Sequence, residues 1–165
     1  MAVTIEPFRL MTAGDLPDVH ALEVRSFPVP WTPEMLCEEL VGPGRTYVVA
    51  DGPSGIIGYG GFMLIEDDAH IMTVAVDEPN RRAGVGSRLL LRLIDLALSA
   101  GAEHLTLELR VSNVAARRLY ERFGFAPVGI RPRYYVDEDA LVMWAVNARG
   151  PDYTLLLDEI RQEVA

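Results

Sequence analysis

Apolar side chains spaced three and four residues apart predict helices along this chain. The clearest stripe lies between residues 85 and 100, at Leu89, Leu90, Leu93, Ile94, Ala97 and Ala100, so one face of this helix packs against a core. Gly101 follows the stripe and suits the end of the helix. Three residues that favour helix starts, Thr12, Thr32 and Asn113, predict helices over 12–25, 32–40 and 113–123, and an amphipathic segment predicts a last helix over 154–164.

Alternation of apolar and polar side chains predicts strands. Leu105, Leu107 and Leu109 alternate with Thr106, Glu108 and Arg110, which places the leucines and the polar side chains on opposite faces of one strand. Further strands are expected over 3–10, 46–51, 56–66, 69–76, 126–134 and 140–146. The order of these elements predicts an α/β (α+β) fold, with a mixed, mostly antiparallel central sheet flanked by helices on both faces.

Length and composition predict one globular domain. Half of the 165 residues are hydrophobic, and we expect a single domain over residues 1–147 followed by a tail, 148–165, that carries the last helix. No apolar run is long enough for a membrane span and the N-terminus lacks the order of a signal peptide, so we expect a cytoplasmic protein without membrane association. Cys37 is the only cysteine, which excludes an internal disulfide and predicts a buried or indifferent thiol and no metal site.

The charge is unevenly distributed. The formal net charge of −9 argues against a nucleic-acid partner, and it divides into −10 over residues 1–80, +6 over 81–133 and −5 over 134–165. Most arginines of the basic segment are expected on solvated helix faces, whereas Arg81 and Arg82 are better placed to meet a phosphate. Acidic clusters could attract a basic peptide, although a solvated surface is the simpler interpretation. They include Asp67-Asp68 and Asp137-Glu138-Asp139.

A glycine-rich loop, Arg81–Ser87, connects the strand ending at Val76 to the longest helix. Its two glycines allow backbone N–H groups to approach a ligand closely, and the helix directs its partly positive N-terminus to the same place. A dinucleotide fingerprint would need a glycine where Leu89 stands, and a nucleoside triphosphate loop would need a lysine before Ser87. The loop therefore predicts a site for another phosphate-bearing cofactor, or else a plain tight turn.

Several blocks of sequence together resemble the GNAT acetyltransferases. They are Val74-Ala75-Val76, Arg81-Arg82-Ala83-Gly84-Val85-Gly86, Leu107-Glu108-Leu109-Arg110-Val111-Ser112-Asn113 and Leu119-Tyr120-Glu121-Arg122-Phe123-Gly124-Phe125. Within the family the chain is most similar to the ribosomal-protein-alanine N-acetyltransferases (RimI-like enzymes), whose Glu-x-Arg-x-Ser-Asn-x-x-Ala-x-x-Leu-Tyr block matches Glu108 to Tyr120 without a gap. Arg25-Ser26-Phe27-Pro28 with Trp31, and Arg131-Pro132-Arg133-Tyr134-Tyr135, agree with this resemblance, whereas Val29-Pro30 looks inserted and the tail after Asn147 departs from the pattern.

The resemblance implies how the chain would bind acetyl-CoA. The pyrophosphate would lie on backbone N–H groups of the loop formed by Arg81, Arg82, Ala83, Gly84, Val85, Gly86 and Ser87, while Val74, Ala75 and Val76 would hold the pantetheine arm and the acetyl group. Asn113 would contact the cofactor, although it also has the sequence context of a helix N-cap, and both roles can hold at once.

The resemblance also implies the catalytic groups. Glu108 would be the proton acceptor and Tyr120 the proton donor to the departing thiolate, with Trp31, Tyr134 and Tyr135 lining a peptide slot. The structural alternatives are a solvated charge for Glu108, a half-buried ring for Tyr120 and simple packing for the other three aromatic residues. His20, His70 and His104 have no metal-ligand spacing and no paired nucleophile, so we expect structural or surface roles for them.

The expected activity is transfer of the acetyl group of acetyl-CoA directly to the α-amine of a protein. The resemblance implies that the acceptor is the N-terminal alanine of a small-subunit ribosomal protein. An α-amine has a pKa of about 7.8 and a lysine about 10.4, so deprotonating lysine costs roughly 3.5 kcal/mol more at neutral pH. Glu108 is a poor base at its ordinary pKa, so we expect it to act after desolvation or through water. The alternatives are a GNAT enzyme for a small-molecule amine or a lysine side chain, and a non-catalytic module that binds acyl-CoA.

Overall fold

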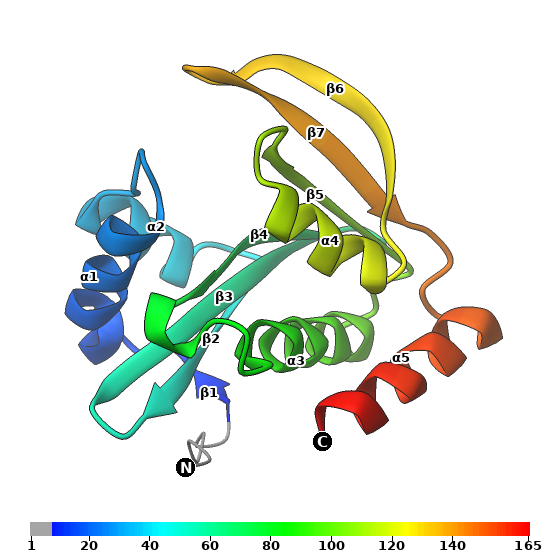
Figure 1. Cartoon of the computed structure of the whole chain (residues 1–165), viewed down its shortest axis with the longest axis horizontal. Helices are drawn as coiled ribbons and strands as arrows, with labels where there is room; N and C mark the ends of the chain where they lie inside the picture. The colour runs from blue at the N-terminus through cyan, green and yellow to red at the C-terminus, as the bar shows by residue number, and fades with distance from the viewer. Residues whose placement is uncertain (1–7) are drawn as a thin grey trace. The chain divides into compact units, whose positions relative to one another are not determined.

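The computed structural model describes residues 8–165. Its strands are β1 (Arg9–Leu10), β2 (Arg45–Gly52), β3 (Gly55–Ile65), β4 (Asp68–Val76), β5 (His104–Arg110), β6 (Ala126–Tyr135) and β7 (Glu138–Ala145). Its helices are α1 (Leu16–Ser26), α2 (Pro33–Val41), α3 (Val85–Ser99), α4 (Val114–Arg122) and α5 (Pro151–Val164), as labelled in Figure 1, with short 3-10 turns at Ala13–Asp15 and Glu78–Asn80. The first part of the strand expected over 3–10 lies outside the described residues, and the described part is β1.

Hydrogen bonds order the described strands as β1-β2-β3-β4-β5-β7-β6. β4 pairs with β5 in parallel, whereas β1 with β2, β2 with β3, β5 with β7 and β6 with β7 pair antiparallel. The expectation of a mixed, mostly antiparallel sheet is therefore confirmed. Contacts divide the chain into two compact units, one comprising the chain up to Met63 with Thr73–Leu93, and the other Leu64–Met72 with Ile94–Ala165.

In the first unit, Gly60 of β3 allows close packing. A Cβ atom on Gly60 would lie 2.9 Å from the carbonyl oxygen of Thr73 and 2.8 Å from Cδ1 of Leu93, so a larger side chain would push apart β3, β4 and α3. Val85, the first residue of α3, is buried in a cluster with Ala50 and Ile57. The start of α3, and with it the preceding loop, is thereby fixed against β2 and β3.

In the second unit, α5 packs against its surroundings through one face. Tyr153, Leu157 and Ile160 are buried, and the Tyr153 hydroxyl donates a hydrogen bond of 2.8 Å to the carbonyl oxygen of Phe123. The helix begins earlier than the apolar pattern indicates, because Pro151 occupies its first position, where proline needs no intrahelical partner.

β6 is the edge strand of the second unit and pairs with β7 as a long curved hairpin (Figure 1). Nine of its ten residues are exposed. Pro127 and Pro132 lack backbone donors, and the register with β7 shifts twice along the strand. Prolines and irregular register are features that keep an exposed sheet edge from pairing with further strands.

Two observations bear on the expectations from composition. Cys37 is exposed on α2, so burial of this thiol is excluded. Within residues 8–165, the helices are all too short or too polar to span a lipid bilayer.

Candidate active site

The loop before α3 contains two residues in the left-handed region. Arg82 has a φ of 69° and Gly84 a φ of 81°. Glycine adopts this conformation freely, whereas for an arginine it costs roughly 1–2 kcal/mol. A non-glycine residue held in this region is a local strain, which proteins retain mainly at functional positions.

The loop delivers backbone donors to the start of a 15-residue helix. The N–H group of Arg88 donates to the carbonyl oxygen of Gly84 at 3.0 Å, so the N–H groups of Val85 and Gly86 precede this first helical bond. Arg81 braces the loop through a 2.9 Å hydrogen bond from Nε to the carbonyl oxygen of Val76. Donors at a helix N-terminus beside exposed arginine side chains suit a pyrophosphate.

The strand before this loop is the predicted acyl-binding segment. Ala75 is buried and lies against β3, where a Cβ atom on Gly58 would be 3.1 Å from its carbonyl oxygen. Val74 and Val76 are half-buried and, by strand alternation, share the opposite face of β4. The first unit therefore contains Val74 to Val76 and the loop Arg81–Ser87 as one continuous segment.

In the second unit, Glu108 of β5 lies in a polar cluster. Its side chain is only 5% exposed, and one carboxylate oxygen is hydrogen-bonded to Nε2 of His70 on β4. The other oxygen is 3.4 Å from Nη2 of Arg131 on β6. His70 pairs with Thr106 in the β4–β5 register, which brings it to the same face of the sheet as Glu108.

The surroundings of Glu108 act on its pKa in opposite directions. Burial raises the pKa, whereas the hydrogen bond and charge of His70, and then the charge of Arg131, lower it; the net pKa is below the ordinary value. The carboxyl group is therefore ionised at neutral pH although it is almost fully buried. The interpretation of Glu108 as a solvated charge is excluded by its burial.

His70 is a residue that sequence reasoning did not find. We expected a structural or surface role for it, whereas in the structure its imidazole is hydrogen-bonded to the carboxylate of Glu108. Alternation along β4 predicts which face of the sheet His70 lies on. It does not predict the register with β5 that brings His70 to Glu108, because these two residues are 38 positions apart in the sequence.

Tyr120 lies on α4 and is 8% exposed, which excludes a half-buried ring. Its ring packs edge-to-face against Phe125, with the centroids 5.7 Å apart. Burial raises the pKa of its phenol, with a smaller contribution from Tyr135, so the hydroxyl keeps its proton across the physiological pH range.

Asn113 is the N-cap of α4, as its sequence context indicates. Its Oδ1 accepts a hydrogen bond of 3.1 Å from the N–H group of Ala116. This bond uses the side-chain oxygen and leaves the amide N–H groups of Asn113 as potential donors to a ligand.

The three aromatic residues predicted at the peptide slot have different surroundings. Tyr134 is 50% exposed and meets Tyr135 edge-to-face at 5.2 Å. Tyr135 donates a 3.4 Å hydrogen bond to the carbonyl oxygen of Glu108, and the guanidinium of Arg110 lies 4.5 Å from its ring centre. Trp31, in the loop between α1 and α2, is half-buried, and its backbone N–H group donates a hydrogen bond of 3.1 Å to Oε1 of Glu23.

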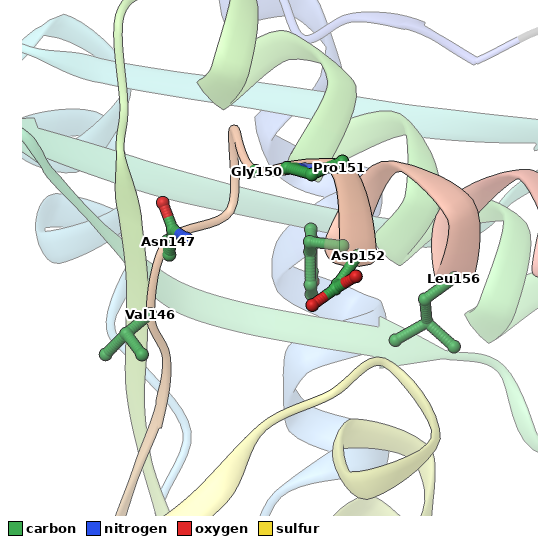
Figure 2. A pocket seen from close by; sticks show the side chains of 7 residues that line it. Val146, Asn147, Gly150, Pro151, Asp152 and Leu156 are labelled. Carbon is green, nitrogen blue, oxygen red and sulfur yellow. The ribbon is translucent and has the colours of Figure 1, made fainter.

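A shallow pocket lies elsewhere in the second unit, at the junction of β7 and α5. It has a volume of about 260 Å³ and is lined by Val146, Asn147, Gly150, Pro151, Asp152, Tyr153 and Leu156, which Figure 2 shows from close by. The predicted site residues are not among its lining residues.

Over the part of the chain that the structure describes, His, Cys, Asp and Glu side chains form no cluster of three or more that could hold a metal ion.

Comparison with known proteins decides the family. The acetyltransferase (GNAT) family matches residues 16–125, which include the loop before α3, Glu108 and Tyr120. The chain belongs to this family. GNAT enzymes use acetyl-CoA, and this chain is therefore an acetyl-CoA-dependent acetyltransferase.

Several named proteins are similar to this GNAT chain over most of its length. A Bacillus subtilis (strain 168) protein, provisionally named a ribosomal protein bS18-alanine N-acetyltransferase, is 38% identical over 82% of this chain and 92% of its own length. The Escherichia coli (strain K12) ribosomal protein bS18-alanine N-acetyltransferase is 33% identical over 78% of this chain and 89% of its own. The crystal structure of the Escherichia coli ribosomal-protein-S18-alanine N-acetyltransferase superposes with a TM-score of 0.78 at 30% identity, covering 86% of this chain and 93% of that one.

Proposed function

We propose that this enzyme transfers the acetyl group of acetyl-CoA to the α-amine of a protein, and that the acceptor is the N-terminal alanine of a small-subunit ribosomal protein. Relatives at 38% and 33% identity are named for this acceptor, and they match this chain over most of its length. The single observation that carries the proposal is Glu108, a buried and ionised carboxylate bonded to His70 within the matched family segment.

Most of the residues proposed to bind the cofactor form one segment of the first unit. Backbone N–H groups of Arg82 to Ser87 would bind the pyrophosphate, with Arg81 and Arg82 adding positive charge. Val74, Ala75 and Val76 would hold the pantetheine arm and the acetyl group, and the amide of Asn113 would add a contact from the start of α4. The bound cofactor supplies an activated thioester.

Glu108 would remove the proton from the attacking amine. Only the neutral amine is a nucleophile, and an α-amine with a pKa of about 7.8 needs far less help at neutral pH than a lysine. Because His70 and Arg131 lower the pKa of Glu108, the carboxylate is a weak base for direct transfer. A water molecule between Glu108 and the amine would relay the proton, and His70 would hold the carboxylate in place.

Tyr120 would complete the reaction. Its buried phenol remains protonated, so it can donate a proton to the departing sulfur as the carbon–sulfur bond breaks. The phenol would afterwards regain a proton from solvent. The amine keeps the acetyl group, and the enzyme forms no covalent intermediate.

An acceptor panel tests the reaction class. We expect acetylation of peptides beginning with alanine, and much slower reaction of peptides beginning with serine or methionine, of lysine peptides with a blocked N-terminus and of polyamines. Mass spectrometry of protein N-termini in the host, with and without this enzyme, identifies the natural acceptor. Acetyl transfer only to lysine or polyamines, or binding of acetyl-CoA without any transfer, would refute the proposal.

Substitution of the proposed base tests the mechanism. Glu108→Gln keeps the size of the side chain but removes the charge, and we expect kcat to fall by about 10²–10⁴ because general-base catalysis contributes this much. The control is Glu103→Gln, an exposed position just before the same strand, which should leave kcat unchanged. An unchanged kcat and pH profile in Glu108→Gln would show that another group accepts the proton.

A further inference from the structure

A second buried carboxylate, outside the proposed catalytic groups, lies in the first unit. Glu23 of α1 is 3% exposed. Its Oε1 accepts a hydrogen bond of 3.1 Å from the backbone N–H group of Trp31, and its Oε2 accepts one from the hydroxyl of Tyr59 on β3. One side chain thus connects a helix, a strand and the loop between α1 and α2.

The network continues to the predicted acyl-binding strand. Tyr59 is fully buried, and its phenol is also hydrogen-bonded to the side chain of Thr73 on β4. Thr73 directly precedes Val74, the first residue of the segment proposed to hold the pantetheine arm and acetyl group. A continuous path of hydrogen bonds therefore runs from the backbone of Trp31 through Glu23 and Tyr59 to Thr73.

Stability alone does not explain a carboxylate at this place. Burial raises the pKa of Glu23, against the opposing effects of Tyr59, Trp31 and His20, which shows that the charged form loses solvation there. Apolar side chains of similar volume commonly serve as well as buried polar groups in holding a fold together. What an apolar residue cannot do is fix the backbone N–H group of Trp31 at one position.

The loop that Glu23 holds has features of a ligand-contacting surface. Residues 27–32 contain two prolines and the half-buried ring of Trp31, while Val29 is 64% exposed. At the end of α1, next to this loop, the Oγ atom of Ser26 is the one fully buried side-chain polar atom without a partner within residues 8–165. Exposed apolar groups on a loop that is held in one conformation suit the side chains of an extended peptide.

We infer that Glu23 is a positioning residue for acceptor binding: together with Tyr59 it fixes the loop carrying Trp31, and through Thr73 it ties that loop to the acyl-binding strand. This inference rests on the proposed function and on the prediction that Trp31 lines the peptide slot. Glu23 itself does not exchange protons with the reacting atoms. Its effect is to keep the acceptor surface and β4 in one arrangement.

The chain offers a matched control. Glu39 on α2 also accepts a tyrosine hydroxyl, that of Tyr47 at 2.8 Å, together with Nε of Arg45 at 2.9 Å. This carboxylate–phenol pair joins α2 to β2, and both partners of Glu39 lie on β2 and outside residues 27–32. Its removal should reproduce any general loss of stability without releasing the acceptor loop.

Steady-state kinetics with an alanine-starting peptide test the positioning role. In Glu23→Gln and in the milder variant Tyr59→Phe we expect the KM for the peptide to rise about tenfold, the scale of one hydrogen bond to a charged group, while kcat and the KM for acetyl-CoA change less than about twofold. Glu39→Gln and Tyr47→Phe should leave all three parameters unchanged.

Fluorescence gives a second readout that does not depend on activity. In a Trp144→Phe background Trp31 is the remaining tryptophan, and acrylamide should quench it more strongly in Glu23→Gln and Tyr59→Phe than in the parent or the Glu39 and Tyr47 variants. Equal KM values, or equal quenching, in the Glu23 and Glu39 variants overturns the positioning role. A wild-type enzyme that acetylates no peptide N-terminus overturns the proposed function instead, whereas active wild type with an unaltered Glu23→Gln overturns only this inference.

Discussion

The chemistry proposed for Glu108 depends on which side chains surround it. Burial by itself would make this carboxyl group a better base, but His70 and Arg131 reverse the effect and keep it ionised. Alternation along β5 predicts the position of Glu108 beside a polar face, whereas its ionisation depends on residues in β4 and β6 that strand pairing brings close. A single sequence therefore predicts Glu108 as a candidate residue but does not predict its protonation state.

Removing His70 should change the pH dependence of the reaction. In His70→Leu, burial still raises the pKa of Glu108 while the opposing hydrogen bond and charge are lost, so the pKa rises. The carboxylate is the active form, and activity should therefore disappear at a higher pH as the solution is acidified. The acid limb of kcat/KM against pH, measured for a peptide acceptor, gives this shift.

The control for this prediction is His104→Gln, on β5. His104 accepts the N–H group of Asn147 through Nδ1 at 3.0 Å, and a glutamine oxygen can replace that acceptor. Its acid limb should coincide with that of the wild type. If the acid limb of His70→Leu moved to lower pH, or did not move, Glu108 would not be the group that titrates there.

At the level of elements, local signals predicted most helix and strand positions. Thr32 caps α2 through the N–H group of Met35, and Pro33 starts that helix, as the sequence indicates. The segment after Thr12 differs, because Thr12 and Asp15 form a capping box around a 3-10 turn and α1 begins only at Leu16. Both arrangements satisfy the same local rules, so the sequence does not distinguish them.

Asn113 has two roles in this account, as the N-cap of α4 and as a proposed contact of the cofactor, and substitutions can separate them. Asn113→Asp retains an oxygen that accepts the N–H group of Ala116 but lacks the amide donor, so we expect unchanged stability and a higher KM for acetyl-CoA. Asn113→Ala removes both and should also cost about 1 kcal/mol of unfolding free energy. Chemical denaturation and the KM for acetyl-CoA measure the two effects.

Thr32→Ala provides the comparison for the loss of a cap. It removes the corresponding acceptor for Met35 at the start of α2, and we expect a similar loss of stability with an unchanged KM for acetyl-CoA. An Asn113→Asp enzyme with the wild-type KM for acetyl-CoA would show that the side chain acts only as a cap.

For the whole molecule, sequence patterns predicted the fold class but not the order of the strands. β7 lies between β5 and β6, and the register that pairs Glu108 of β5 with Val142 of β7 joins distant parts of the chain. Neither periodicity nor capping contains this information, because strand neighbours are chosen by packing over long sequence separations. The order of the elements predicts a mixed sheet with helices, and the resemblance to GNAT enzymes assigns that sheet to a known fold.

The charge of the whole chain predicts a salt effect on acceptor binding. With a net charge of −9, the enzyme should attract basic peptides over a distance of about 10 Å at 0.1 M salt. We expect the KM for a peptide rich in lysine and arginine to rise about threefold or more between 0.05 and 0.3 M salt, as expected for screened surface charges. Initial rates over a range of salt concentrations measure this.

A neutral peptide with the same first residues is the control, and its KM should hardly depend on salt. Salt-independent binding of the basic peptide would mean that the acidic clusters are solvated surface without a role in recruitment. That outcome would leave the proposed chemistry at Glu108 unaffected.

The prolines of β6 have a consequence for how the protein behaves in a crowded cell. Pro127 and Pro132 interrupt the donors of a strand whose outer side is exposed, and the register shifts bend it. We therefore expect this edge of the sheet to resist pairing with strands of other copies, including the strand stacking that builds fibrils. The uncovered hairpin can thus remain exposed to solvent without becoming a starting point for amyloid.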